Sequence, residues 1–190
     1  MEKINKLKKI FKSKKIDGYI IPKNDEFFGE YIPSNKDRLK YISDFTGSYG
    51  LALILNDNNY LFVDGRYTLQ ANKQSVKFFK IKTIPNELPL QVLKKKKLKI
   101  GFDPSLFTKK NLNIFFGKTN CKFIPINDNL IDQIYKFKEK VTKPFYSLKK
   151  NVAGESHNSK ILKIVNYLKL NKADYLFISA PENVAWTLNI

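Results

Sequence analysis

The sequence predicts an α/β protein in which helices flank a mixed sheet, followed by the start of a second, similar unit. Three observations support this fold class. Short β-rich segments alternate with apolar segments at helical spacing through residues 1–135, as in a layered α/β domain. Two β-rich segments, 51–55 and 60–63, flank an Asn- and Asp-rich turn and predict a hairpin. Finally, the N-terminal helix–strand–helix pattern recurs after residue 150.

The N-terminal part is expected to form a helix, a strand and a second helix. Apolar residues recur at helical spacing from Ile4 to Phe11, which predicts an amphipathic helix over 2–15 with a lysine-rich outer face. The β-rich run 17–22 ends at a proline, as expected of a strand, because proline cannot donate to the interior of a sheet. Helical spacing then predicts a helix over 35–45, with a glycine just beyond it as a stop.

After the hairpin the chain keeps alternating between the two patterns. Each predicted strand is a short β-branched or aromatic run, and each predicted helix shows apolar residues at helical spacing. The lysine run 94–97 lies between two such segments and is expected to face solvent in a turn. The predicted helices cover 67–74, 88–94, 108–116 and 131–135, and the predicted strands cover 78–81, 99–102 and 122–124.

A change of composition marks the end of the first domain. Residues 136–150 are rich in lysine, contain a proline and show little periodicity, which is typical of a linker. Helical spacing then returns at 161–168, and a β-rich run predicts a strand at 173–179. We therefore expect a first domain over 1–135, a linker, and the truncated beginning of a second domain over 151–190.

Composition limits the classes of function. No run is long enough to span a membrane, and the N-terminus lacks an apolar signal core, so we expect a cytoplasmic protein without a membrane partner. The basic amphipathic first helix leaves a membrane-surface or targeting role as an alternative. The single cysteine, Cys121, cannot form an internal disulfide, which agrees with a reducing compartment.

The formal net charge of +18 is typical of a nucleic-acid partner. However, only two of the 35 basic residues are arginines, and the lysines are spread over every segment. Proteins that read phosphates usually gather arginines and aromatic side chains on one face. We therefore expect no nucleic-acid partner.

A search for chemistry finds no catalytic constellation. The only histidine, His157, is expected at the surface near the start of a helix, and Cys121 is expected to pack beside a strand. The adjacent acids Asp25 and Glu26 are expected in a solvated loop, and no phosphate-binding motif is present. We expect no catalytic and no metal-binding residue in this chain.

The two arginines are the distinctive candidates for binding. A chain that uses lysine almost everywhere else has reason to keep arginine where a planar, bidentate fork is needed. Arg66 follows a turn at a strand end, where its side chain is able to contact a carboxylate or peptide carbonyl; an internal salt bridge to Asp64 is the alternative. Arg38 is expected to bond a helix terminus or a neighbouring acid. Arg66 is the predicted substrate contact, with Tyr67, Asp64 and Arg38 as further candidates.

Several of these segments, in this order and spacing, resemble the amino-terminal part of Xaa-Pro aminopeptidase, also called aminopeptidase P, in its long three-domain form. Each motif is weak alone, and their order along nearly the whole chain makes the resemblance specific. The matching segments are DGYIIP (17–22), EYI (30–32), FTGS (45–48), DGRY (64–67), LQA (69–71), GFDP (101–104), NLIDQIY (129–135), AGES (153–156) and NVAW (183–186).

The resemblance implies two creatinase-like N-terminal domains followed by a C-terminal catalytic domain. That last domain binds two divalent metal ions, usually manganese, and activates a water that cleaves the bond before a proline at position two of a peptide. It also implies that Arg66 contacts the peptide. This chain would then be a non-catalytic, inactive part without a cofactor of its own, and its partners would be the peptide substrate, its own catalytic domain and a second copy in a homodimer.

Two points leave alternatives open. Residues 25–29 replace a more polar family segment, which places any substrate contact there in doubt, and the chain stops inside the second domain. A free-standing basic module that binds nucleic acid is one alternative function. A truncated scaffold that serves oligomerisation is the other.

Overall fold

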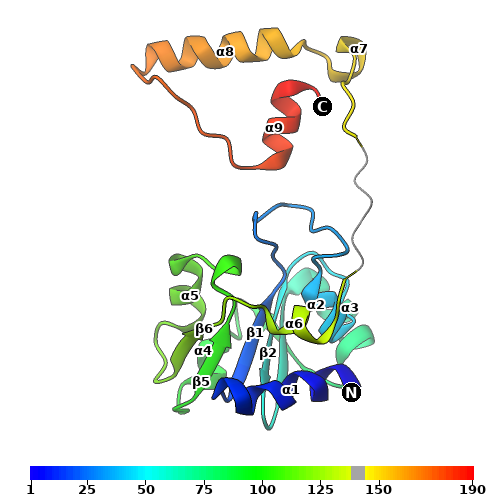
Figure 1. Cartoon of the computed structure of the whole chain (residues 1–190), viewed down its shortest axis with the longest axis vertical. Coiled ribbons are helices and arrows are strands. Elements are labelled where there is room, and N and C mark those ends of the chain that lie inside the picture. Colours follow the sequence, from blue (N-terminus) through cyan, green and yellow to red (C-terminus); the bar gives the residue numbers. More distant parts are fainter. Residues whose placement is uncertain (138–143) are drawn as a thin grey trace. The chain divides into compact units, whose positions relative to one another are not determined.

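The computed structural model describes residues 1–137 and 144–190, which form two compact units. The first unit contains a sheet with its helices (Figure 1). The second contains the chain from residue 144 onward together with Phe27–Glu30. The predicted domain boundaries at 135 and 151 stay predictions, and part of the predicted linker, 138–143, lies outside the described residues.

The first unit is built on a six-stranded sheet. Its strands are β1 (Gly18–Pro22), β2 (Gly50–Leu55), β3 (Asn59–Asp64), β4 (Lys80–Ile84), β5 (Lys99–Phe102) and β6 (Lys122–Pro125). Their order across the sheet is β4-β3-β2-β1-β5-β6. Strand β2 is antiparallel to both of its neighbours, whereas the other three pairings are parallel. The mixed sheet predicted from the alternating pattern is confirmed.

Helices cover both faces of this sheet. They are α1 (Glu2–Lys14), α2 (Arg38–Ser43), α3 (Thr68–Ser75), α4 (Pro89–Leu93), α5 (Lys109–Phe116) and α6 (Leu130–Ile134), with the 3₁₀ turns η1 (Gly65–Tyr67) and η2 (Pro104–Leu106). One apolar cluster joins α1, α2, α3 and α6 to one face, and a second joins α4 and α5 to the other. This is the layered α/β/α arrangement that the sequence predicts.

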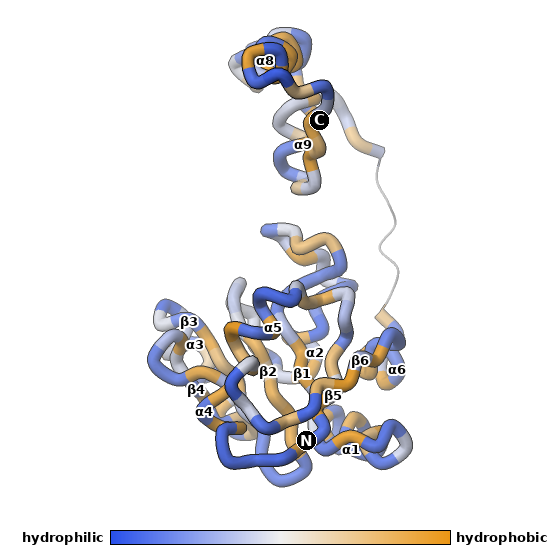
Figure 2. Tube along the Cα trace, turned by 90° about the vertical axis from the view of Figure 1, so that its left-hand side faces the viewer, coloured by the Kyte–Doolittle hydropathy of each residue, from blue (hydrophilic) through white to orange (hydrophobic). Residues whose placement is uncertain are grey.

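Strand β1 shows how the sequence creates two cores. Tyr19 and Ile21 point into the first apolar cluster, whereas Ile20 points into the second, because successive side chains of a strand face opposite sides of the sheet. All three are at most 1% exposed. The middle strands of the sheet accordingly carry much of the hydrophobic colouring of the first unit (Figure 2).

The predicted elements of the first unit are confirmed, with shifts of a few residues at their ends. In the hairpin, Leu55 pairs with Asn58 through its backbone, so the turn is shorter than the four residues expected. Strand β4 begins two residues later than predicted, because Phe78 and Phe79 bond back to Ser75 at the end of α3. Phe79 packs in the core from that turn.

Helix α2 is shorter than the predicted 35–45 because both of its ends are capped. The Asp37 side chain accepts a hydrogen bond from the backbone N–H of Lys40, which fixes the start of the helix. Asp44 adopts a left-handed conformation with a φ of 61° and ends it. The helix therefore presents a short apolar face with Arg38 at its first turn.

The second unit consists of α7 (Lys150–Ala153), α8 (His157–Leu170) and α9 (Pro181–Leu188). The predicted helix around 161–168 is confirmed as part of α8, but the predicted strand at 173–179 is wrong, since this run has no regular structure. A strand needs a partner for its backbone groups, and no strand is present among the described residues of this unit. Its aromatic side chains Tyr175 and Phe177 are 91% and 90% exposed.

Polar contacts hold the second unit together. Lys160, in α8, is 3% exposed and donates to the Trp186 carbonyl and to the Asn189 side chain, at 2.7 and 2.8 Å. The Lys160 ammonium also interacts favourably with the partial negative charge at the C-terminal end of α9. The buried residues among 144–190 are Lys160, Thr187 and Asn189, all polar.

No helix in the described parts of either unit is long and apolar enough to cross a membrane.

Candidate functional site

The carboxyl ends of five strands lie along one edge of the sheet, because every strand except β2 runs in the same direction. This is the edge at which open α/β sheets bind ligands. The loops that follow β1, β3, β5 and β6 carry polar residues there, namely Asp25, Glu26, Asp64, Arg66, Asp103 and Asn129. These residues fall into three groups that differ in burial and in chemistry.

The first group is the turn after β3. The Asp64 carboxylate accepts hydrogen bonds from both the backbone N–H and the Nε of Arg66, each at 2.9 Å. These bonds lower the pKa of Asp64 and raise the pKa of Arg66. The internal pair that the sequence left open therefore exists, yet the Arg66 side chain stays 74% exposed. Such an arrangement holds the guanidinium while leaving most of it accessible.

Aromatic side chains surround this turn. The Arg66 guanidinium lies over the ring of Tyr67, 5.5 Å from its centroid. Tyr67 is itself fixed, because its hydroxyl bonds Ser48 Oγ at 2.7 Å and its ring packs edge-on against Phe45. Tyr49, the residue directly before β2, is 45% exposed. Partial burial and then the negative charge of Asp64 raise the pKa of Tyr49. The antiparallel register of β2 and β3, in which Gly50 pairs with Val63, brings Tyr49 beside the same turn.

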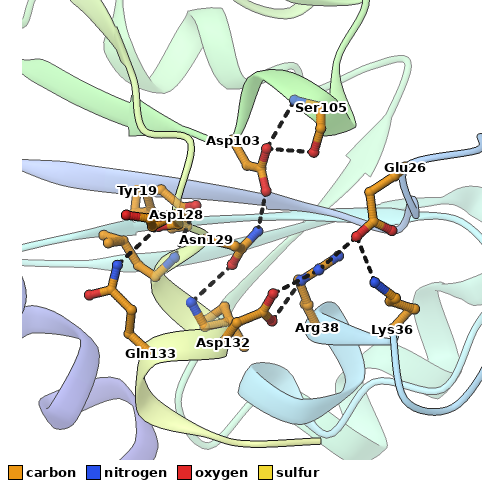
Figure 3. Close-up of polar contacts among 12 residues, drawn as sticks. Tyr19, Glu26, Lys36, Arg38, Asp103, Ser105, Asp128, Asn129, Asp132 and Gln133 are labelled. Atoms are coloured by element: carbon orange, nitrogen blue, oxygen red, sulfur yellow. Dashed lines mark hydrogen bonds and ion pairs between the residues drawn. The ribbon is translucent and has the colours of Figure 1, made fainter. Parts of the chain in front are cut away.

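The second group is centred on Arg38, whose side chain is 4% exposed (Figure 3). Its Nε and Nη2 both bond the Asp132 carboxylate at 2.8 Å, a bidentate pair between residues far apart in sequence. Nη2 also lies 3.2 Å from Glu26 Oε1, and Lys36 bonds the same oxygen at 2.8 Å. Arg38 thus ties helix α2 to helix α6 and to the loop after β1.

The electrostatics follow these contacts. Burial alone would raise the pKa of Glu26, but hydrogen bonds from Lys36, its own backbone and Arg38 outweigh that effect and lower the pKa to about 2. Burial likewise opposes the charged form of Arg38, and the Asp132 and Glu26 carboxylates outweigh it, so the pKa of Arg38 is raised. Both groups therefore stay ionised across the physiological range, which suits an ion-pair network rather than proton transfer.

A third set of contacts fills the sheet edge beside β1 (Figure 3). The Asp103 carboxylate accepts from Ser105 and from the Asn129 side chain, at 2.6 and 2.8 Å. Asn129 in turn accepts from the backbone of Ile131, and the Leu130 backbone reaches the Tyr19 hydroxyl. Asp103 and Asn129 are 4% and 6% exposed. Here the protein's own side chains occupy the place where the strand order reverses, so this end of the sheet is closed.

The structure therefore separates the predicted site residues. Asp64, Arg66 and Tyr67 lie together in an exposed turn, whereas Arg38 belongs to the buried network. The expected solvated loop at Asp25 and Glu26 is wrong, because Asp25 is 4% exposed and Glu26 joins the Arg38 network. Sequence reasoning also missed Asp132; the rarity of arginine at Arg38 was the available signal.

Other expectations concern metals and isolated reactive residues. Within the described residues, no group of three or more His, Cys, Asp or Glu side chains is placed to hold a metal ion. His157 is exposed at the first position of α8, as expected. Cys121 is half-buried, bonds the Lys96 carbonyl and packs beside β6, as expected. The exposed turn at Arg66 is therefore the candidate binding site, and it is suited to recognition rather than to catalysis.

Comparison with known proteins identifies the family. The family model for the creatinase/prolidase N-terminal domain matches residues 3–134, and a second model with the same description matches 136–190. The whole chain aligns at 33% identity with Xaa-Pro aminopeptidase 1 of Dictyostelium discoideum, of which it covers 33%. It aligns at 29% identity with a probable Xaa-Pro aminopeptidase P of Laccaria bicolor, of which it covers 31%.

A solved structure extends the similarity to three dimensions. An X-prolyl aminopeptidase from Caenorhabditis elegans, described as a cytosolic enzyme with a di-nuclear active site, superposes with a TM-score of 0.80 at 25% identity. The match covers 99% of this chain and 34% of that one. The chain thus spans about a third of the length of its curated relatives. It belongs to the creatinase/prolidase N-terminal domain family and is homologous over its full length to the N-terminal third of Xaa-Pro aminopeptidases P.

Proposed function

We propose that this chain is the non-catalytic N-terminal part of an Xaa-Pro aminopeptidase, the metallopeptidase that releases the first residue of peptides with proline at position two. The observation that carries the proposal is that the full length of this chain aligns with about a third of the length of such enzymes. The two divalent metal ions, manganese in our prediction, belong to a catalytic domain outside this chain, since the described residues offer no set of ligands. We place the enzyme in the cytosol, like its C. elegans relative.

In this role the chain shapes access to the catalytic domain and contributes Arg66. The guanidinium is exposed, held by Asp64 and backed by Tyr67, so it is ready to bond a carbonyl or carboxylate of a peptide. Arg38 has a structural role, because both of its bonded nitrogens are committed to acids within the fold. The alternative of a nucleic-acid module has only the net charge in its favour.

The first test is activity. The 190-residue chain, assayed with Mn²⁺ and the peptide Ala-Pro-Ala-Ala, should show no turnover. A chimera that joins this chain to the remainder of the Dictyostelium enzyme should show turnover. Robust metal-dependent activity of the isolated chain would contradict the proposal, and so would a folded chimera that releases no alanine while the parent enzyme does.

The second test concerns Arg66 within the active chimera. Arg66→Ala should raise KM several-fold, and Arg66→Lys should restore little of the loss, because an ammonium group cannot form the bidentate contact. The matched control is Lys73→Ala, which removes an exposed positive charge from the neighbouring helix α3. Equal KM values for Arg66→Ala and Lys73→Ala would remove Arg66 from the site.

A further inference from the structure

We propose that Tyr49 and Arg66 form a two-point contact for a peptide, and that Asp64 is the positioning residue that sets the direction of the guanidinium. Arg66 bonds a carbonyl or carboxylate oxygen, while the Tyr49 ring packs against an apolar side chain or a proline ring one or two residues away. This inference deepens the proposed function and rests on it for the class of ligand. Tyr49 is the residue that neither the sequence analysis nor the proposed function assigns.

The donors of Arg66 define the first contact point. A guanidinium has five N–H donors in a planar fork, and Asp64 takes one from Nε at 2.9 Å and one from Nη2 at 3.5 Å. The remaining donors lie on the outer edge of the fork, on a side chain that is 74% exposed. That edge has the geometry for one carboxylate or for one or two carbonyl oxygens.

The direction of this fork is set by a short chain of contacts. Asp64 Oδ1 bonds the backbone N–H of Arg66 as well as its Nε, so the carboxylate is itself held by the 3₁₀ turn η1. Beneath the guanidinium lies Tyr67, which is fixed by Ser48 and by its packing on Phe45. A ligand therefore meets a pre-oriented donor pair, which reduces the entropy lost on binding.

Tyr49 supplies the second contact point. It follows Ser48 directly, and the antiparallel register that pairs Gly50 with Val63 brings it beside Asp64. Partial burial and then the Asp64 carboxylate raise the pKa of its phenol. The residue is 45% exposed and is not part of either apolar cluster. Tyrosine and arginine are enriched where proteins bind peptides and other proteins, and exposed aromatic rings are the usual partners of proline-containing segments.

The charge of the patch favours a peptide over a nucleic acid. The Asp64 carboxylate bonds Arg66 and lies beside Tyr49 in the β2–β3 register, and its negative charge repels a phosphate backbone. A peptide carbonyl carries no net charge, so Asp64 strengthens the orientation of Arg66 without repelling the ligand. A single terminal carboxylate is accommodated on the outer edge of the fork.

The test is a titration of the isolated, ¹⁵N-labelled 190-residue chain with Ala-Pro-Ala-Ala. We expect shifts in the Tyr49 amide and in the Arg66 Nε–H resonance. Tyr49→Ala and Arg66→Lys should each weaken binding about five- to tenfold, and Tyr49→Phe should bind like the natural chain. The control Tyr31→Ala removes another aromatic ring, which is 87% exposed, and should leave binding unchanged.

Asp64→Asn separates positioning from contact. It should weaken binding two- to fivefold and broaden or shift the Arg66 Nε–H signal before any peptide is added, whereas Tyr49→Ala should leave that signal in place. The inference is overturned if 10 mM peptide shifts neither resonance, or if Tyr49→Ala and Tyr31→Ala bind alike. It is also overturned if a dT12 oligonucleotide, and not the peptide, binds through Tyr49 and Arg66 with a steep dependence on salt.

These outcomes are independent of the test of the proposed function. Turnover by the chimera decides whether the chain is part of an Xaa-Pro aminopeptidase. The titration of the isolated chain decides whether the patch binds peptide. If the chimera is active and the peptide shifts neither resonance of the isolated chain, the proposed function stands and the two-point contact is refuted.

Discussion

Replacing Arg38 by methionine tests how much the buried ion network stabilises the first unit. Methionine keeps most of the aliphatic stem but removes the charge that Glu26 and Asp132 share. Removing one partner of a buried ion pair typically costs 3–5 kcal/mol. The two acids are 29% and 42% exposed, so water screens them once Arg38 is gone, and we expect a smaller loss of about 2–3 kcal/mol.

The assay is urea unfolding followed by far-UV circular dichroism. The only tryptophan, Trp186, lies in the second unit, so its fluorescence does not report on the first unit. With an unfolding slope of about 2 kcal/mol/M, the expected loss lowers the midpoint by about 1–1.5 M. The control is Lys40→Met, which removes one positive charge from the exposed side of the same helix and should move the midpoint by less than about 0.3 M.

A double variant checks the cause of the loss. If the cost comes from leaving Asp132 without its partner, adding Asp132→Asn to Arg38→Met should recover part of the stability. The reasoning is refuted if Arg38→Met and Lys40→Met have the same midpoint. It is also refuted if the two substitutions add without coupling, because the bidentate pair would then carry no interaction energy of its own.

Two further predictions concern the same unit. The folded-state pKa of Glu26, about 2, lies below the ordinary 4.5, so the unfolded chain binds the proton more readily and stability is lost as the pH falls from about 4.5 to 2. Glu26→Gln should cost about 1–2 kcal/mol of unfolding free energy at pH 7 and should flatten the fall of the urea midpoint over this acidic range. An unchanged fall of the midpoint would contradict the assignment. Gly18→Ala should lower the free energy of unfolding by about 1–3 kcal/mol, because a Cβ there would lie 2.7 Å from the Ile54 carbonyl oxygen. In the matched control Gly65→Ala, the new Cβ meets nothing nearer than 3.8 Å, so this substitution should be tolerated. Equal urea midpoints for the two variants would show that space at Gly18 is not limiting.

The sequence predicts elements well where their stability is local. The two strands of the hairpin are adjacent in sequence and pair with each other, and α1 follows from its apolar spacing. The strand predicted at 173–179 fails for the opposite reason: its residues favour a strand, but a strand forms only with a neighbour, and sequence propensity says nothing of that neighbour's presence.

The contacts of the candidate site also differ in whether the sequence predicts them. Asp64, Arg66 and Tyr67 are consecutive or nearly so, and their proximity could be predicted from the turn alone. Arg38 and Asp132 are 94 residues apart, and no spacing rule pairs them. Tyr49 reaches the Asp64 turn only because β2 and β3 are antiparallel neighbours, with Gly50 opposite Val63. Contacts that depend on register come from the folded sheet, and the printed sequence does not reveal them.

The all-polar interior of the second unit has a calorimetric consequence. The heat-capacity change of unfolding comes mainly from apolar surface that becomes exposed to water, and no apolar residue among 144–190 is buried. Scanning calorimetry should therefore give a heat-capacity change close to that of about 130 residues, roughly 1.6–2.0 kcal/mol/K, well below the value for a fully packed chain of this length. Any partner that covers Tyr175 and Phe177, which are 91% and 90% exposed, would raise this heat-capacity change. The quantity therefore measures the apolar core of the second unit.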